Sequence, residues 1–149
     1  MEIRQAAIKD LPDLAEGALM FYATSKFLKN FRLDRFIAIW TKMLETGTGV
    51  IFSLYDGPVG VGAIGGVVYP DLYSGHLVAT EFFWFVVPEY RGKNGMELYW
   101  KFEHWALAQK CKEIRMVHLM DSMPDRLATV YKRLGYEAAE THYVKSLEV

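Results

Sequence analysis

The fold of this chain is decided at Phe85-Val86-Val87-Pro88-Glu89-Tyr90-Arg91-Gly92-Lys93-Asn94-Gly95-Met96, where a strand, a turn and a helix follow one another. The strand begins upstream, in a run over residues 77–87 that is almost entirely apolar and aromatic, as is typical of a strand buried on both faces. Pro88 ends the strand, and helical periodicity begins after the turn. A buried strand that leads directly into a helix is half of a crossover unit, so residues 77–87 are predicted to form the centre of an α/β sheet.

The same stretch predicts an anion-binding site where the helix begins. The first N–H groups of a helix have no acceptor within the helix, and the positive end of the helix dipole lies there. Gly92 and Gly95 would let the backbone approach a bulky phosphate group, and Arg91 and Lys93 add positive charge. The alternative is an ordinary strand-to-helix turn whose basic side chains face solvent.

Upstream, apolar spacing predicts a short strand, two helices and a hairpin. The strand lies within residues 1–7, and apolar residues at intervals of three and four predict helices over residues 11–22 and 33–44. Two strands, over residues 50–54 and 59–69, are joined by a turn with glycine and proline, which is the ordinary signal for a hairpin. The glycines of the second strand indicate a bulge or a close backbone approach.

Downstream, the helix that follows the turn is expected to end near residue 110. A strand over residues 114–120, a helix over 125–134 and a final strand or pair of strands over 136–147 complete the pattern. The predicted order is therefore β-α-α-β-β-β-α-β-α-β. No linker, repeat or low-complexity segment divides it, so residues 1–149 are predicted to form one domain of the α/β (α+β) class.

The amino-acid composition limits the classes of partner that the protein is expected to bind. Hydrophobic residues make up 52% of the chain and aromatic residues 15%, which suggests an aromatic-lined cleft or a buried self-association face, so a homodimer is one expectation. Lysine and arginine number 17 against 18 aspartates and glutamates, giving a net charge of −1. The chain has no overall basic field to attract nucleic acid, so nucleic acid is not an expected partner.

Cysteine, histidine and hydropathy patterns exclude further classes. Cys111 is the only cysteine, which rules out an internal disulfide or a thiolate metal cluster, and the histidines do not share a metal-ligand spacing, so no metal is expected. No apolar run approaches the roughly 18 residues of a membrane span, and the amino terminus lacks the pattern of a secretory signal. We therefore expect a cytoplasmic protein without a membrane partner.

The quoted loop resembles the acyl-CoA pyrophosphate loop of the GNAT superfamily of acyl-CoA-dependent N-acetyltransferases. In that pattern an Arg or Gln is followed by two residues, a Gly, one residue, and a Gly or Ala. Arg91 matches the first position, whereas Asn94 and Met96 stand at the two small-residue positions. A loop shortened by one residue would match Gly95 to the last of them. The contacts between the loop and the pyrophosphate are therefore expected to differ in detail from those of the family pattern.

A second motif and the order of elements carry the same resemblance. Residues 130–136, Val-Tyr-Lys-Arg-Leu-Gly-Tyr, closely resemble the family signature of a tyrosine, two or three residues, and glycine followed by an aromatic residue. The predicted elements match the superfamily over essentially the whole chain. Residues 69–75 and the aromatic residues around Trp84 are also similar to acetyltransferase-like sequences of bacteriophages.

The resemblance implies a mixed sheet splayed at its middle strand, with helices on both faces, and acetyl-CoA as the acyl donor. It implies direct transfer to a primary amine in a ternary complex. Backbone N–H groups near the end of the strand would hold the pantetheine and polarise the thioester, and the loop would hold the pyrophosphate. The residues concerned would be Val86, Val87, Arg91, Gly92, Lys93, Asn94, Gly95 and Met96. Tyr131 matches the family position of a general acid beside the sulfur, although its place on an apolar stripe also fits a core residue.

Two residues compete for the role of general base. Glu81 is the only acidic residue in the central strand, and desolvation among aromatic neighbours would raise its pKa toward neutrality. Its parity relative to Val86 places it on the wrong face of the strand unless a bulge intervenes. His118 is the alternative, since histidine accepts protons near neutral pH. Each fits a structural role equally well, as a paired carboxylate or a hydrogen-bonded histidine.

The acceptor is left open by the sequence. A small metabolite, a protein amino group or a modified nucleobase could supply the amine, although the neutral charge of the chain disfavours a large polyanion. Tyr22, Phe36 and Trp40 could line the acceptor cleft or simply belong to the core. Two other functions compatible with this fold are non-catalytic acyl-CoA binding and protein interaction through the aromatic surface.

Overall fold

A five-stranded mixed sheet organises the part of the chain that the computed structural model describes, residues 1–23, 25–28 and 30–148. The strands lie side by side in chain order: β1 (Glu2–Gln5), β2 (Gly49–Asp56), β3 (Val59–Pro70), β4 (Leu77–Val86) and β5 (Glu113–Arg115). Neighbours are antiparallel from β1 to β4, and β5 pairs parallel to β4. The parallel pair confirms the crossover predicted from the strand–turn–helix stretch.

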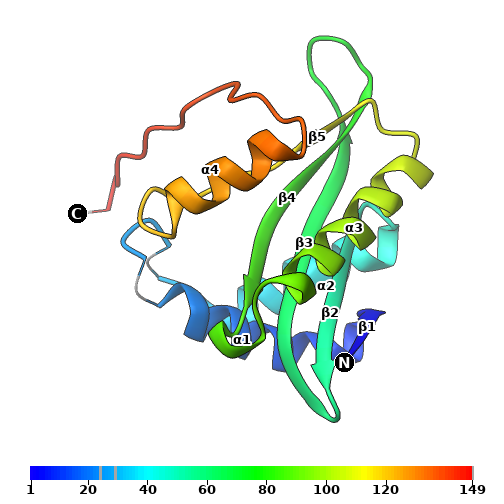
Figure 1. Cartoon of the computed structure of the whole chain (residues 1–149), viewed down its shortest axis with the longest axis vertical. Coiled ribbons are helices and arrows are strands. Elements are labelled where there is room, and N and C mark those ends of the chain that lie inside the picture. Colours follow the sequence, from blue (N-terminus) through cyan, green and yellow to red (C-terminus); the bar gives the residue numbers. More distant parts are fainter. Residues whose placement is uncertain (24, 29, 149) are drawn as a thin grey trace.

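Helices cover both faces of the sheet, which confirms the expected fold class (Figure 1). Helices α1 (Leu11–Tyr22) and α2 (Leu33–Thr46) pack on one face, around a core that includes Trp40 and Phe83. Helix α3 (Lys93–Ala108) packs on the other through its buried stripe of Leu98, Phe102 and Ala106. Helix α4 (Pro124–Arg133) lies beside β4, and in the view of Figure 1 β4 runs between α4 and α3.

A β-bulge in the centre of the sheet confirms what the glycines of β3 indicated. Gly65 is opposite Phe83 and Gly66 is opposite Glu81, so Phe82 is an extra residue in β4. Gly66 must be glycine, because a Cβ there would lie 2.5 Å from the Thr80 carbonyl oxygen and 2.6 Å from the Phe102 ring. The bulge turns Glu81 onto the face of the sheet that α3 covers.

The final strand predicted over residues 136–147 is wrong, because residues 136–148 form no strand or helix. Its apolar side chains remain in solvent, with Tyr143 92% exposed and Leu147 85% exposed. A strand needs a partner, and the adjacent edge belongs to β5, which is only 3 residues long instead of spanning 114–120. Among the described residues, no helix is long and apolar enough to cross a membrane.

Candidate active site

Strands β4 and β5 separate beyond Thr80, as expected for a splayed sheet. The β4–β5 pairing covers Val78–Thr80 against Glu113–Arg115 only. Further along β4, the Val87 N–H donates to the Val61 carbonyl of β3 at 2.8 Å. Alternate residues of an antiparallel strand face opposite edges, so Val86 presents its N–H and C=O to the open side. Val86, rather than Val87, therefore faces the gap between the strands.

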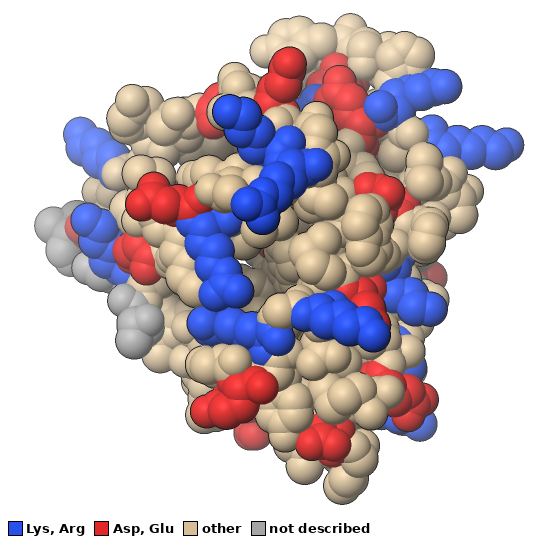
Figure 2. Space-filling view, viewed as in Figure 1, with Lys and Arg blue, Asp and Glu red and all other residues tan. Residues whose placement is uncertain are grey.

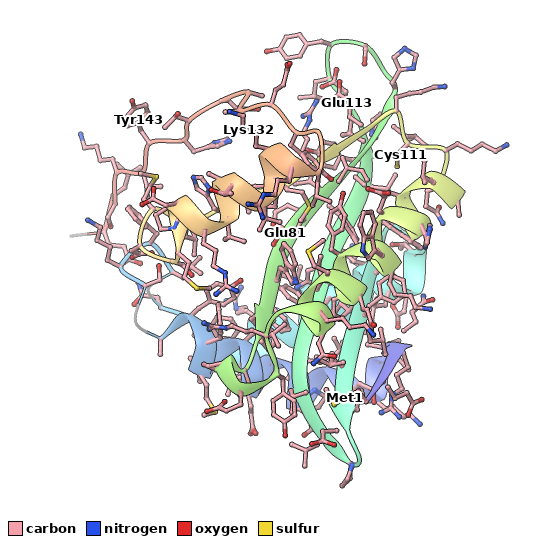
Figure 3. All side chains as sticks on the ribbon, in the orientation of Figure 1. Met1, Glu81, Cys111, Glu113, Lys132 and Tyr143 are labelled. Atoms are coloured by element: carbon pink, nitrogen blue, oxygen red, sulfur yellow. The ribbon has the colours of Figure 1, made fainter. Side chains whose placement is uncertain are left out.

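Glu81 stands where the two strands part. Its side chain is 3% exposed, and Oε2 accepts a hydrogen bond from the Val117 N–H at 3.2 Å. Burial raises the pKa of Glu81 to about 8, although the Val117 hydrogen bond opposes that rise. Figure 3 shows the side chain on β4 beside α4. The bulge at Phe82 removes the parity objection, because it brings Glu81 to the same face as Val86.

Tyr131 and Glu81 both form hydrogen bonds with the backbone of Val117. Its hydroxyl donates to the Val117 carbonyl oxygen at 2.7 Å, while Glu81 accepts from the Val117 N–H. Burial raises the pKa of Tyr131, and the nearby Glu81 carboxylate raises it further. The phenol therefore keeps its proton and can act as a donor. A buried carboxyl group and a protonated phenol thus both bind the backbone of one residue, Val117.

Tyr22, at the end of α1, adds a second hydroxyl to this region. Its oxygen accepts a hydrogen bond from the Trp84 N–H at 3.3 Å, on the open edge of β4. Burial, with a contribution from Glu81, raises the pKa of Tyr22. The sequence indicated Tyr22 only as one of several helical aromatic residues, and of those Trp40 and Phe36 pack in the core against Phe83. Its position at the last turn of the helix was the one available sign of a different role.

One pocket joins these groups. His118, the other candidate base, is half-buried and lines it as well, so the structure brings both predicted bases together. The lining residues come from α1, the loop after it, β4, the loop after β5, and α4: Phe21, Tyr22, Leu28, Glu81, Phe82, Trp84, Val117, His118, Leu119, Ser122, Leu127 and Tyr131. Among the described residues, no group of three or more His, Cys, Asp or Glu side chains is placed to hold a metal ion.

The predicted phosphate loop begins at the far end of the open edge. Gly92 adopts a φ of +90°, a conformation that favours glycine, and α3 begins at the next residue. The first intrahelical bond runs from the Met96 N–H to the Gly92 carbonyl oxygen at 3.2 Å. The N–H groups of the three intervening residues precede it and are free to bind an anion. This backbone fits the pyrophosphate expected from the sequence.

The side chains of the loop contact the protein itself. The Arg91 Nε donates to the Val86 carbonyl oxygen at 3.0 Å, which links the loop to the open edge of β4. Asn94 Nδ2 donates to the Tyr90 carbonyl oxygen at 2.9 Å, so the residue that departs from the family pattern folds back onto the turn. Lys93 is exposed and lies 3.6 Å from a carboxylate oxygen of Glu97. Figure 2 shows Lys and Arg side chains around a hollow between α3 and α4.

Solved structures share this fold. An aminoglycoside N-acetyltransferase, AAC(6′)-Iy in complex with CoA, is 17% identical with a TM-score of 0.77, covering 99% of this chain and 95% of that one. A predicted acetyltransferase with acetyl-CoA from Clostridium acetobutylicum is 14% identical with a TM-score of 0.75, covering 98% and 96%. An aminoglycoside acetyltransferase from an uncultured soil metagenomic sample, in complex with trehalose, is 20% identical with a TM-score of 0.75, covering 99% and 96%.

The family itself follows from the sequence match. No curated protein sequence matches the chain. The family model for the acetyltransferase (GNAT) family, however, matches residues 16–136, which include the splayed strand, the loop and the Tyr131 helix. The chain therefore belongs to the GNAT family of acetyltransferases.

Proposed function

We propose that the protein transfers an acetyl group from acetyl-CoA to a primary amine, directly and within a ternary complex. The observation that carries this proposal is a pair of hydrogen bonds at Val117. The Tyr131 hydroxyl donates to the Val117 carbonyl oxygen at 2.7 Å, and the Val117 N–H donates to the Glu81 carboxylate at 3.2 Å. They hold a proton donor and a proton acceptor together at the start of an open strand edge. Acyl transfer from a thioester to an amine needs both groups and a donor to the carbonyl oxygen.

Backbone and loop groups would hold the donor substrate. The open edge at Val86 offers an N–H group to the pantetheine or the thioester oxygen, whereas the Trp84 N–H already donates to the Tyr22 hydroxyl. The turn at Gly92, the start of α3 and the charges of Arg91 and Lys93 would hold the pyrophosphate. The neighbours solved with CoA or acetyl-CoA support this assignment through their shared fold.

As the neutral amine nitrogen attacks the thioester carbonyl, it would give a proton to the ionised Glu81 carboxylate. The new C–N bond forms and the C–S bond breaks, and the departing sulfur gains a proton from Tyr131. Exchange with solvent then restores both residues, so protons balance over the cycle. The raised pKa of Tyr131 keeps its phenol protonated until the thiolate leaves, and the raised pKa of Glu81 supports a base that works near neutral pH. His118, at the same pocket, is the competing base.

Thiol release from acetyl-CoA with a panel of primary amines tests the function. Glu81→Gln and Tyr131→Phe should each lower kcat by about 100-fold with CoA affinity unchanged in isothermal titration. Tyr143→Phe is the matched control, because Tyr143 is 92% exposed and should leave the rate unaltered. Failure to bind CoA at tenths of a millimolar would overturn the donor assignment. Binding without turnover of any amine would instead indicate a CoA-binding protein without catalysis.

A further inference from the structure

We infer that the acceptor is a small hydrophobic monoamine, an inference that rests on the acetyl transfer proposed above. The pocket at Glu81 has apolar or aromatic walls contributed by every element around it: Phe21, Leu28, Phe82, Trp84, Leu119 and Leu127. Such walls favour burial of hydrocarbon and offer no partners to a polyhydroxylated ring. The few polar groups, chiefly Glu81 and the two tyrosine hydroxyls, gather at the strand edge where the reaction is proposed.

When Glu81 is ionised, the charge of the pocket matches one ammonium group, because Glu81 is the one acidic residue among the described residues that line it. Asp121, next to the lining residue Ser122, does not line the pocket, and its oxygens accept hydrogen bonds from the Ser25 hydroxyl at 3.0 Å and the Lys26 N–H at 2.9 Å. A second ammonium on the acceptor would therefore lose its hydration among apolar side chains without an opposite charge.

The mouth of the pocket extends the apolar surface. Phe82, the bulge residue, is 59% exposed, and Leu28 and Val117 are also exposed to solvent. Exposed apolar side chains grouped beside a pocket are typical of a ligand-binding surface. The Ser25–Asp121 hydrogen bonds tie the loop after α1 to the loop before α4, so the two sides of the pocket are held close together. This favours a small molecule over a protein chain.

A homologous series of primary alkylamines, assayed with acetyl-CoA, measures the contribution of the apolar walls. Burial of one methylene favours the longer amine, so kcat/KM should rise about threefold to fourfold for each added methylene until the chain exceeds the pocket. Aryl-ethylamines should follow the longer alkylamines. Spermidine and a deoxystreptamine aminoglycoside should react at least about tenfold more slowly than pentylamine, because their extra ammonium groups find no carboxylate.

Two matched variants test whether the pocket itself sets the preference. Phe82→Asp adds a carboxylate at the mouth and should lower the ratio of kcat/KM for pentylamine over spermidine by at least about tenfold. Leu77→Asp adds the same charge to an exposed position of the same strand, outside the pocket, and should leave the ratio unchanged. Because the readout is a ratio within one variant, a general loss of activity from altered ionisation of Glu81 does not affect it.

The outcomes separate this inference from the proposed function. Preference for spermidine or the aminoglycoside, or a flat alkylamine series, would overturn the inference while acetyl transfer stands. An unchanged ratio in Phe82→Asp, with normal thermal unfolding, would also overturn it. If no amine is acetylated although CoA binds, the proposed function fails and the inference fails with it.

Discussion

Glu81 makes the stability of the protein depend on pH, and replacing it with glutamine should remove that dependence. Burial raises its pKa from 4.5 to about 8. Between these values the folded protein holds a proton that the unfolded chain releases, so this stabilisation is complete below pH 4.5 and is lost as the pH rises. The slope is about 1.4 kcal/mol per pH unit, which gives a loss of about 4 kcal/mol between pH 5 and pH 8.

Urea unfolding followed by circular dichroism, repeated from pH 5 to pH 9, measures this loss. The free energy of unfolding of Glu81→Gln, minus that of the original protein, should increase by about 4 kcal/mol from pH 5 to pH 8 and level off above it. Other titrating groups cancel in this difference. Glu89→Gln, the same substitution at an exposed position, is the matched control. Parallel curves for Glu81→Gln would refute the reasoning, because they would mean that Glu81 is ionised in the folded protein.

The same ionisation should appear in the rate. With a pKa of about 8, about a tenth of Glu81 is ionised at pH 7, so kcat/KM should rise about tenfold between pH 7 and pH 9. The acceptor for this assay is trifluoroethylamine, which is already neutral in this range and adds no titration of its own. Glu81→Gln should lack the ascending limb. A limb that survives unchanged would assign the base to His118 or to water.

Two pairs of glycine variants test the loop and the sheet. Gly92→Ala and Gly57→Ala both place a side chain at positive φ, so each should lower the free energy of unfolding by about 1–2 kcal/mol. Only Gly92→Ala should weaken CoA binding in titration calorimetry, by about tenfold. Equal CoA affinities of the two variants would argue against the phosphate loop. Gly66→Ala should destabilise the protein by about 3 kcal/mol or more, because its Cβ would lie 2.6 Å from the Phe102 ring, whereas Gly60→Ala has 3.7 Å of clearance and should be tolerated. Similar melting temperatures for these two variants would contradict the packing argument.

Local patterns were enough to predict most elements. The helix predicted over residues 11–22 coincides with α1, and the strand over residues 77–87 coincides with β4 to within one residue. In the helix the apolar residues recur at intervals of three and four, and in the strand they form a nearly continuous run, so both signals are local. The turn at Gly92 was predictable for the same reason, since proline and glycine act on their own backbone.

Features that depend on distant partners could not be predicted in this way. Residues 136–147 contain apolar residues after a predicted helix, but no strand of the described residues lies beside them, and a local pattern alone does not form a sheet. The early end of β5 has a comparable cause, because the Glu81 carboxylate accepts the Val117 N–H just beyond the last β4–β5 pair. The hydrogen bond from the Trp84 N–H to the Tyr22 hydroxyl joins residues 62 positions apart, so neither local sequence indicates it.

The bulge at Phe82 explains why a buried carboxylate is tolerated in the central strand. Without the extra residue, Glu81 would point into the apolar core on the face of α1 and α2, where Trp40 and Phe83 pack and desolvation would be uncompensated. With the extra residue, the carboxylate accepts a hydrogen bond from the Val117 N–H, which has no strand partner among the described residues because the chain leaves the sheet after β5. The Glu81 side chain thus lies where the pairing of β4 with β5 ends, and it supplies the proposed base at the open edge of β4. The stability given up above pH 4.5 is the consequence of keeping an ionisable group at that point.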